Sequence, residues 1–198
     1  MGELKKLIIN RIVMSGPISV SEYMETCLTH PLHGYYCRKP VFGGNGDFTT
    51  SPEISQMFGE IMGLWMVKSW LDQGSPQKII LLELGPGRGT LLNDALRAAS
   101  KVPDFLKSMQ IYLLEKSYQM RQTQKNTLKK FNLTWIENLS QLPEYPLFFI
   151  ANEFFDALPI KQYKKIHDVW RERLISAKRD KLILKLSDLP LKKFELAN

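Results

Sequence analysis

Three glycines follow an apolar run in the segment LLELGPGRGT, which covers residues 81–90. Gly85, Gly87 and Gly89 have no side chains, so the backbone at these positions can come close to a bound ligand. The dinucleotide pattern G-x-G-x-x-G/A requires a small residue at position 90, where this chain has Thr90. The phosphate-binding pattern G-x-x-x-x-G-K-S/T is absent. The loop therefore predicts a ligand-binding turn that differs from both of these motifs.

Two carboxylates accompany this loop. Glu83 stands before the first glycine, and Glu115 ends the next apolar run, QIYLLE, about where an acidic residue binds a ribose diol in nucleotide-binding folds. They suit a ligand with a cationic amino group and a ribose, and Glu83 would repel a pyrophosphate. S-adenosylmethionine has these groups and no phosphate, so we expect it as the cofactor. Arg88 is the counter-evidence, since it would bind phosphate or the ligand's own carboxylate. For Glu115, a surface charge at a strand end is the alternative.

Further polar side chains lie in the segment NEFFDALP, which begins directly after the apolar run YPLFFIA. Methyl transfer depends mainly on positioning the attacking nucleophile, so side chains at this strand end are candidates for holding the acceptor. Glu153 and Asp156 could bind a guanidinium group, with Asn152 beside them, and we predict these three as catalytic residues. The alternative is that Asn152 and Glu153 cap the loop, and Asp156 fits that reading equally well.

The segment GGNGDFTTSPE, residues 43–53, is a long glycine-rich stretch before a helix, and such loops often cover a site. We expect Asp47 to contribute to cofactor binding from this loop. The alternative is a surface loop that ends in a helix cap. Thr50 and Glu53 have the spacing of a capping box, and Ser51 with Pro52 could equally be the cap and the first helical residue.

Apolar runs and helical patterns alternate along the middle of the chain, which predicts a right-handed parallel α/β unit. The sequence divides into an N-terminal helical part (1–75), a Rossmann-like cofactor-binding half (76–160) and a short β excursion (161–198). Expected parallel strands lie at 78–84, 110–117, 133–137 and 145–152, and short antiparallel strands at 161–166, 170–176 and 181–186. The fold class is therefore α/β, Rossmann-like, with an N-terminal helical extension and a sheet that we expect to be incomplete at the C-terminus.

Composition narrows the classes of function. The net charge of +7 is spread along the chain, so we predict no nucleic-acid partner, and no apolar run reaches the ~18 residues of a membrane span. Cys27 and Cys37 suggest a reducing compartment, and with His30 and His33 they lack ordinary zinc spacing, so no metal is expected. The N-terminus resembles neither a secretory signal nor a clear transit peptide, which favours the cytoplasm. The oligomeric state is not predicted.

Four segments together resemble the MidA-like family of class I S-adenosylmethionine-dependent methyltransferases: GDFTTSPEISQMFGE, LLELGPGRGTL, ANEFFDALPIKQY and WRER. The resemblance implies a seven-stranded fold with an added helical part and S-adenosylmethionine as cofactor. It also implies a protein substrate, with arginine as the methyl acceptor and a respiratory complex I subunit as the target. A eukaryotic member would act in the mitochondrial matrix. By motif match, Glu83 and the three glycines would bind the amino-acid end of the cofactor, and Glu115 its ribose.

The chain departs from this family in length, because members usually run well beyond it and complete the sheet. We therefore expect either a truncated or inactive methyltransferase, or a non-catalytic assembly or binding protein that retains the fold. A nicotinamide or flavin dinucleotide enzyme is a third hypothesis, and Thr90 in the glycine loop argues against it.

Overall fold

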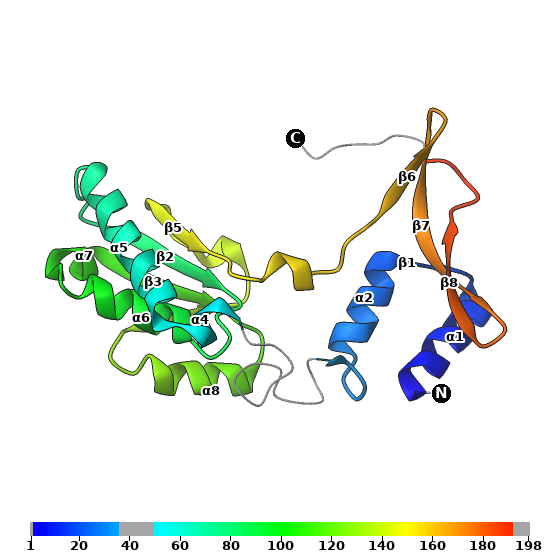
Figure 1. The fold of residues 1–198 in the computed structure, drawn as a ribbon, viewed down its shortest axis with the longest axis horizontal. Coiled ribbons are helices and arrows are strands. Elements are labelled where there is room, and N and C mark those ends of the chain that lie inside the picture. Colours follow the sequence, from blue (N-terminus) through cyan, green and yellow to red (C-terminus); the bar gives the residue numbers. More distant parts are fainter. Residues whose placement is uncertain (1, 36–49, 192–198) are drawn as a thin grey trace. The chain divides into compact units, whose positions relative to one another are not determined.

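The computed structural model describes residues 2–35 and 50–191. The chain forms two compact units. The larger unit is Val41–Asp156, and the smaller unit combines Met1–Pro40 with Ala157–Asn198. Figure 1 labels helices and strands of both units.

A four-stranded parallel sheet forms the centre of the larger unit, in the order β4-β3-β2-β5. The strands are β2 (Ile79–Leu84), β3 (Met109–Leu114), β4 (Leu133–Ile136) and β5 (Leu147–Ile150). These strands confirm the four apolar runs predicted from the sequence and the α/β fold class. Strand β2 comes first in the sequence among these four strands and lies between β3 and β5, so the strand order reverses beside it.

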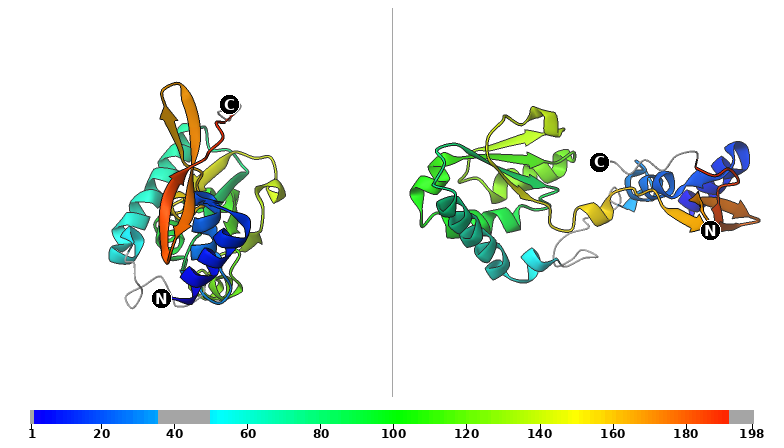
Figure 2. Two further views of the ribbon diagram at one scale, coloured as in Figure 1. Left: turned by 90° about the vertical axis from the view of Figure 1, so that its right-hand side faces the viewer. Right: turned by 90° about the horizontal axis from the view of Figure 1, so that it is seen from above.

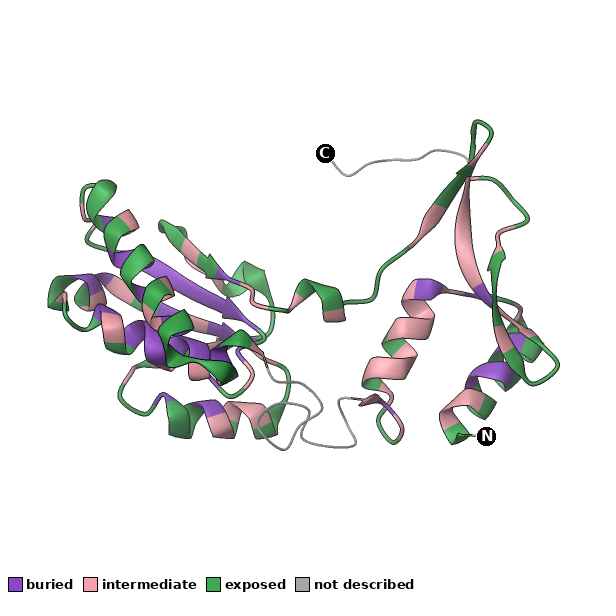
Figure 3. Cartoon of the chain, viewed as in Figure 1, coloured by how far each residue is buried: buried purple, intermediate pink, exposed green. Residues whose placement is uncertain are grey.

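Helices cover one face of this sheet (Figures 1 and 2). They include α6 (Thr90–Ala99), α7 (Pro103–Ser108) and α8 (Tyr118–Thr127), and a 3-10 turn at Leu139–Gln141 precedes β5. Every residue of β2 is buried, as a central parallel strand requires (Figure 3). Leu81, Leu92, Leu96 and Phe105 lie in the main core, and a smaller cluster around Leu82 occupies the opposite face.

Two helices precede β2: α4 (Ser51–Ile54) and α5 (Gln56–Asp72). The sequence predicts one helix here, but Ser55 has extended backbone and its side chain accepts a hydrogen bond from the Met57 N–H, which starts α5 separately. Helix α5 packs closely on α6 because Gly59 and Gly63 bring the two backbones together. Its other face leaves Ile61, Leu64 and Trp65 more than half exposed.

This close packing predicts a large effect at Gly63. A Cβ atom added there would overlap the backbone carbonyl group of Ala95. Gly63→Ala should therefore lower the free energy of unfolding by roughly 1–3 kcal/mol, although alanine is the better helix former by about 1 kcal/mol. Leu64→Ala, one residue along the same helix and exposed, is the control and should cost less than ~1 kcal/mol. Denaturant midpoints measure both changes. A stabilised Gly63→Ala protein would show that helix propensity, and not the contact with α6, decides the outcome.

The smaller unit is an antiparallel sheet with two helices. Strand β7 (Val169–Lys178) pairs with β6 (Tyr163–Ile166), β8 (Lys181–Leu186) and the two-residue strand β1 (Ile18–Ser19). Helices α1 (Glu3–Ser15) and α2 (Val20–Thr29) complete it, and Ser19 and Glu22 form a capping box at the start of α2. Ile8, Ile12 and Ile175 lie in its core. The antiparallel strands expected after residue 160 are confirmed, whereas β1 was not predicted.

The sequence-based division at residues 75 and 160 follows chain order and stays a prediction. The compact units cut across it, because α5 packs on α6 and β1 pairs with β7. Within the described ranges, no helix has the length and apolar character that crossing a membrane requires.

Candidate functional site

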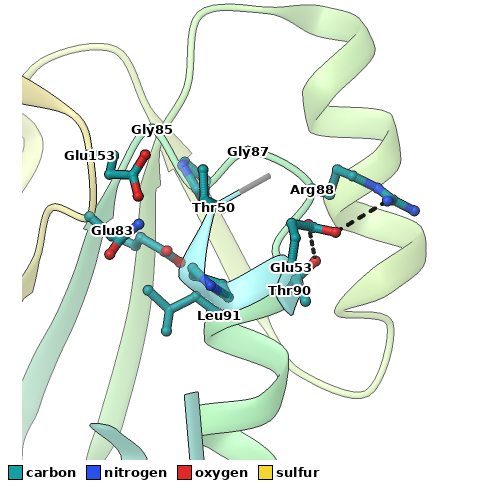
Figure 4. Close-up of a pocket in the computed structure, with 12 residues that line it drawn as sticks. Thr50, Glu53, Glu83, Gly85, Gly87, Arg88, Thr90, Leu91 and Glu153 are labelled. Carbon is teal, nitrogen blue, oxygen red and sulfur yellow. Dashed lines mark hydrogen bonds and ion pairs between the residues drawn. The ribbon is translucent and has the colours of Figure 1, made fainter. Parts of the chain in front are cut away.

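A hollow lies in the larger unit where the strand order reverses, at the carboxyl ends of β2 and β5. In open α/β sheets, ligands bind at this position. The hollow has a volume of about 60 Å³, below the ~300–1,000 Å³ of ordinary ligand clefts, so it has room only for a small group or for one end of a larger ligand. Figure 4 shows many of the side chains around it. It is lined by Thr50, Pro52, Glu53, Glu83, Gly85, Pro86, Gly87, Arg88, Thr90, Leu91, Asn152 and Glu153.

The glycine loop forms the floor of this hollow and connects β2 to α6. Gly85, Gly87 and Gly89 have φ angles of 56°, 53° and 82°, and Gly89 is the left-handed N-cap of α6. A Cβ atom at Gly85 would lie 2.6 Å from the Phe154 ring, whereas one at Gly87 would meet no atom of the described residues within 4 Å. Gly87 therefore presents bare backbone to open space, which suits close approach of a ligand. Gly89 does not line the hollow.

Glu83 is the buried acid of the site. The residue as a whole is 3% exposed, and its Oε2 atom has no hydrogen-bond partner among the described residues. Burial raises the pKa of this carboxyl group to about 8, because a low-dielectric environment disfavours the charged form. Buried polar groups are normally paired, so an unpaired carboxyl oxygen at a ligand-binding position favours a ligand that donates a hydrogen bond or carries positive charge.

Glu53 connects α4 to the glycine loop. Its Oε1 atom accepts a hydrogen bond of 2.7 Å from the Thr90 hydroxyl, and its Oε2 atom lies 3.4 Å from Arg88 Nη1 (Figure 4). Arg88 is thus paired with a protein carboxylate, which weakens its value as evidence for a phosphate ligand. The capping box is not formed, because Thr50 is the N-cap of α4 but makes no side-chain cap bond.

Glu115 lies just beyond the end of β3 and does not line the hollow. Its Oε1 atom accepts a hydrogen bond from the Ser117 N–H at 2.8 Å, and its Oε2 atom accepts one from Gln124 Nε2 at 3.1 Å. Gln124 Nε2 also donates to the Gly87 carbonyl oxygen at 2.8 Å. The fully buried Gln124 thereby joins the two parts of the predicted cofactor site.

The predicted acceptor-side residues follow β5. Asn152 and Glu153 line the hollow, whereas Asp156 lies in the 3-10 turn Phe155–Ala157 and does not. Glu153 is exposed and has a φ angle of 48°, an uncommon backbone conformation for a residue other than glycine. Backbone strain of this kind concentrates at functional sites.

Two further predictions from the sequence concern Asp47 and the absence of a metal site. Asp47 lies outside the described residues. Among the residues that are described, no cluster of three His, Cys, Asp or Glu side chains could hold a metal ion. His30 instead supports a turn, where its Nδ1 atom accepts hydrogen bonds from the Leu32 and His33 N–H groups.

Sequence reasoning did not single out Gln124 or Trp135. The available signal is periodicity, because Met120, Gln124 and Leu128 recur every four residues, as on one face of a helix. A polar residue within such a stripe has to be satisfied by partners in the interior.

Comparison with known proteins is consistent with this arrangement. Residues 61–197 match a family described as "Putative S-adenosyl-L-methionine-dependent methyltransferase". A curated relative from Xenopus laevis, named protein arginine methyltransferase NDUFAF7, mitochondrial, is 42% identical over 85% of this chain and 44% of its own length. The human protein of that name is 36% identical over 83% of this chain and 43% of its own length. The match thus spans less than half of these relatives.

A solved structure supports the same relationship. A Burkholderia thailandensis protein crystallised with S-adenosyl-homocysteine aligns with a TM-score of 0.73 and 26% identity, over 96% of this chain and 50% of that one. This alignment supports the class I methyltransferase fold, and together with the family match it confirms the resemblance to the MidA-like family. The chain belongs to this family of S-adenosyl-L-methionine-dependent methyltransferases.

Proposed function

We propose that this chain forms the cofactor-binding part of an S-adenosylmethionine-dependent methyltransferase that acts on arginine side chains of a protein. The observation that carries the proposal is the buried Oε2 atom of Glu83, which has no hydrogen-bond partner among the described residues and lies in the same hollow as Gly87, where the strand order reverses. A primary ammonium group on the ligand would donate a hydrogen bond to this carboxylate and would also neutralise its negative charge.

The residues fit the cofactor by chemistry. Glu83 would bind the ammonium group, and the backbone of Gly85, Gly87 and Gly89 would lie along the amino-acid end. Glu115 would hold the ribose hydroxyls, since each of its oxygens keeps acceptor capacity beyond the hydrogen bond that it makes. Asp47 remains a cofactor-binding candidate from the sequence. When bound, S-adenosylmethionine supplies an electrophilic methyl group.

The acceptor would be held on the β5 side of the hollow. Glu153 offers an exposed carboxylate at the rim, and Asn152 lies beside it. A carboxylate can hold a guanidinium group through two parallel hydrogen bonds, which orients the attacking nitrogen. Asp156 stays a candidate for the same role from outside the hollow. The names of the curated relatives support protein arginine as the substrate, and the family resemblance points to a respiratory complex I subunit.

Thermal unfolding and calorimetric titration of the whole chain with S-adenosyl-homocysteine test the cofactor half of this proposal. We expect a saturable rise in melting temperature, because a ligand that binds only the folded state stabilises it. Transfer of a labelled methyl group from S-adenosylmethionine to arginine peptides tests the other half. Absence of binding at saturating ligand would contradict the proposal, whereas binding without transfer would support the alternative of a non-catalytic binding or assembly protein.

A prediction at Glu153 separates backbone strain from catalysis. Glu153→Gly relieves the positive φ angle and should raise the free energy of unfolding by ~0.5–1 kcal/mol. It should lower arginine methylation at least about tenfold, since a charged hydrogen bond is lost, and leave the affinity for S-adenosyl-homocysteine unchanged. Ser75→Gly, at a φ angle of 55° away from the hollow, is the matched control for strain. Equal methylation by the two variants would remove Glu153 from the acceptor site.

The compartment is a separate part of the proposal. The relatives named above are mitochondrial proteins by name. The cytoplasm stays a prediction from the sequence, and the mitochondrial matrix is the alternative that these names support. Fluorescence imaging of the tagged protein in its own cells distinguishes the two.

A further inference from the structure

Gln124 on α8 is fully buried, yet its carboxamide makes three hydrogen bonds to residues of other elements. Nε2 donates to the Gly87 carbonyl oxygen at 2.8 Å and to Glu115 Oε2 at 3.1 Å. Oε1 accepts from the indole Nε1–H of Trp135, on β4, at 2.8 Å. One side chain thus bridges the loop after β2, the end of β3 and the neighbouring strand β4.

The orientation of this carboxamide is fixed by its partners. An indole N–H can only donate, so the oxygen of Gln124 has to face Trp135. The two remaining contacts, the Gly87 carbonyl and the Glu115 carboxylate, can only accept, so the amino group has to face them. A flipped amide would oppose two donors at one end and leave two acceptors unsatisfied at the other.

This arrangement holds two ligand-binding groups at a fixed separation. The Glu115 carboxylate is held at both oxygens, by Gln124 and by the Ser117 N–H. The backbone of Glu115 is held as well, because Arg121 Nε donates to its carbonyl oxygen at 2.7 Å. Gly87, which lines the hollow, is held by its carbonyl group. The loop and the carboxylate therefore cannot shift independently while Gln124 is in place.

We propose that Gln124 is a positioning residue that couples the glycine loop to Glu115, so that the amino-acid end and the ribose of one nucleoside ligand bind together. The inference rests on the proposed function, because it concerns the same cofactor site. Gln124 acts through Gly87 and Glu115 and needs no contact with the ligand itself. Preorganisation of this kind strengthens binding by reducing the loss of freedom when the ligand is bound.

Calorimetric titration with S-adenosyl-homocysteine tests the coupling in the whole chain. Gln124→Leu removes the three hydrogen bonds and should weaken affinity by ~10- to 100-fold, since one of them involves a charged group. Trp135→Phe is the matched control, because it removes only the bond to Gln124 Oε1. It should weaken affinity by less than about threefold, even where its melting temperature falls as far as that of Gln124→Leu.

A second variant and a double variant separate positioning from a purely structural role. Gln124→Glu keeps an acceptor for Trp135, but when its new carboxyl group is ionised it has no donor and faces the Glu115 carboxylate, so its affinity should fall at least as far as that of Gln124→Leu. Combining Gln124→Leu with Glu115→Ala should weaken binding less than the product of the two single effects, because both act through one carboxylate.

The outcomes distinguish the two proposals. A wild-type chain that does not bind S-adenosyl-homocysteine overturns the proposed function, and the role of Gln124 falls with it. A wild-type chain that binds, together with Gln124→Leu and Gln124→Glu proteins that bind equally well, overturns the coupling alone. Multiplicative effects in the double variant also overturn the coupling through Glu115.

Discussion

Glu83→Gln is expected to make the protein more stable than the wild type at pH 8 while removing most of its affinity for S-adenosyl-homocysteine. Glu83 as a whole is 3% exposed, and its Oε2 atom lacks a partner among the described residues. In the folded protein its pKa is about 8, against 4.5 as the reference value for the unfolded chain. Ionising this group inside the protein is unfavourable and lowers the free energy of unfolding of the wild type. The neutral amide in Glu83→Gln has a similar shape and carries no such penalty.

The sign of the pH dependence follows from proton binding. Between pH 4.5 and pH 8 the folded wild-type protein holds the Glu83 proton and the unfolded chain does not, so the contribution of this group to stability falls as pH rises. Below that window both states are protonated, and the two proteins should have similar stability. Above it the difference should reach on the order of 2–5 kcal/mol in favour of the variant.

Unfolding in denaturant at pH 5, 7 and 8.5 measures this difference. Glu144→Gln removes the same charge from an exposed position and is the control, for which we expect the wild-type profile. Parallel stability curves for the wild type and Glu83→Gln would contradict the raised pKa.

The same linkage makes cofactor binding pH-dependent. An ammonium group beside Glu83 favours the ionised carboxylate, so binding near pH 7 should release the Glu83 proton. Calorimetric titrations with S-adenosyl-homocysteine, in buffers of different ionisation enthalpy, measure the protons released on binding. The wild type should release about one proton, and Glu83→Gln should lack this release. Affinity of the wild type for S-adenosyl-homocysteine should rise from pH 6 to pH 8. An affinity that does not change with pH would place the ammonium group elsewhere.

The parallel sheet could be predicted from the sequence because residues that are adjacent in the sequence mark each of its strands. Each strand is a short apolar run, and a strand buried on both faces has no reason to alternate polar and apolar residues. The loops after β2 and β5 could also be placed at one site, because the carboxyl ends of parallel strands share one edge of a sheet. Glu83, Gly85 and Glu153 were identified by this argument, and the structure brings all three to the hollow.

Other features could not be predicted because they depend on partners far away in the sequence. The spacing of Thr50 and Glu53 matches a capping box, but Glu53 instead binds Thr90, which is 37 residues further along the chain. A tertiary hydrogen bond thus replaces the local capping contact that the spacing favours, and such conflicts between local and tertiary structure are expected mainly at functional sites. The burial of Gln124 likewise depends on Gly87 and Trp135, and its spacing with Met120 and Leu128 indicates a shared helix face but not the distant partners that this face meets.

Gly87→Ala and Gly74→Ala form a matched pair that should separate ligand contact from backbone strain. Both glycines have positive φ angles, 53° and 81°, and at either position an added Cβ meets no atom within 4 Å in the part of the chain that the structure describes. Both substitutions should therefore cost about 1 kcal/mol of stability, the usual penalty for a residue with a side chain in the left-handed region. Gly74 follows α5 and does not line the hollow, whereas Gly87 does.

Only Gly87→Ala should weaken binding of S-adenosyl-homocysteine, by roughly 10- to 100-fold, because the new methyl group would occupy space that the ligand needs, at an overpacking cost of ~1–3 kcal/mol. The loop cannot rotate to move this methyl group aside while Gln124 holds the Gly87 carbonyl oxygen. Calorimetric titration of both variants, at a temperature where each remains folded, measures the difference. If the two variants bind equally well, the open space beside Gly87 is not where the ligand lies, and the loop would then serve only to turn the chain from β2 into α6.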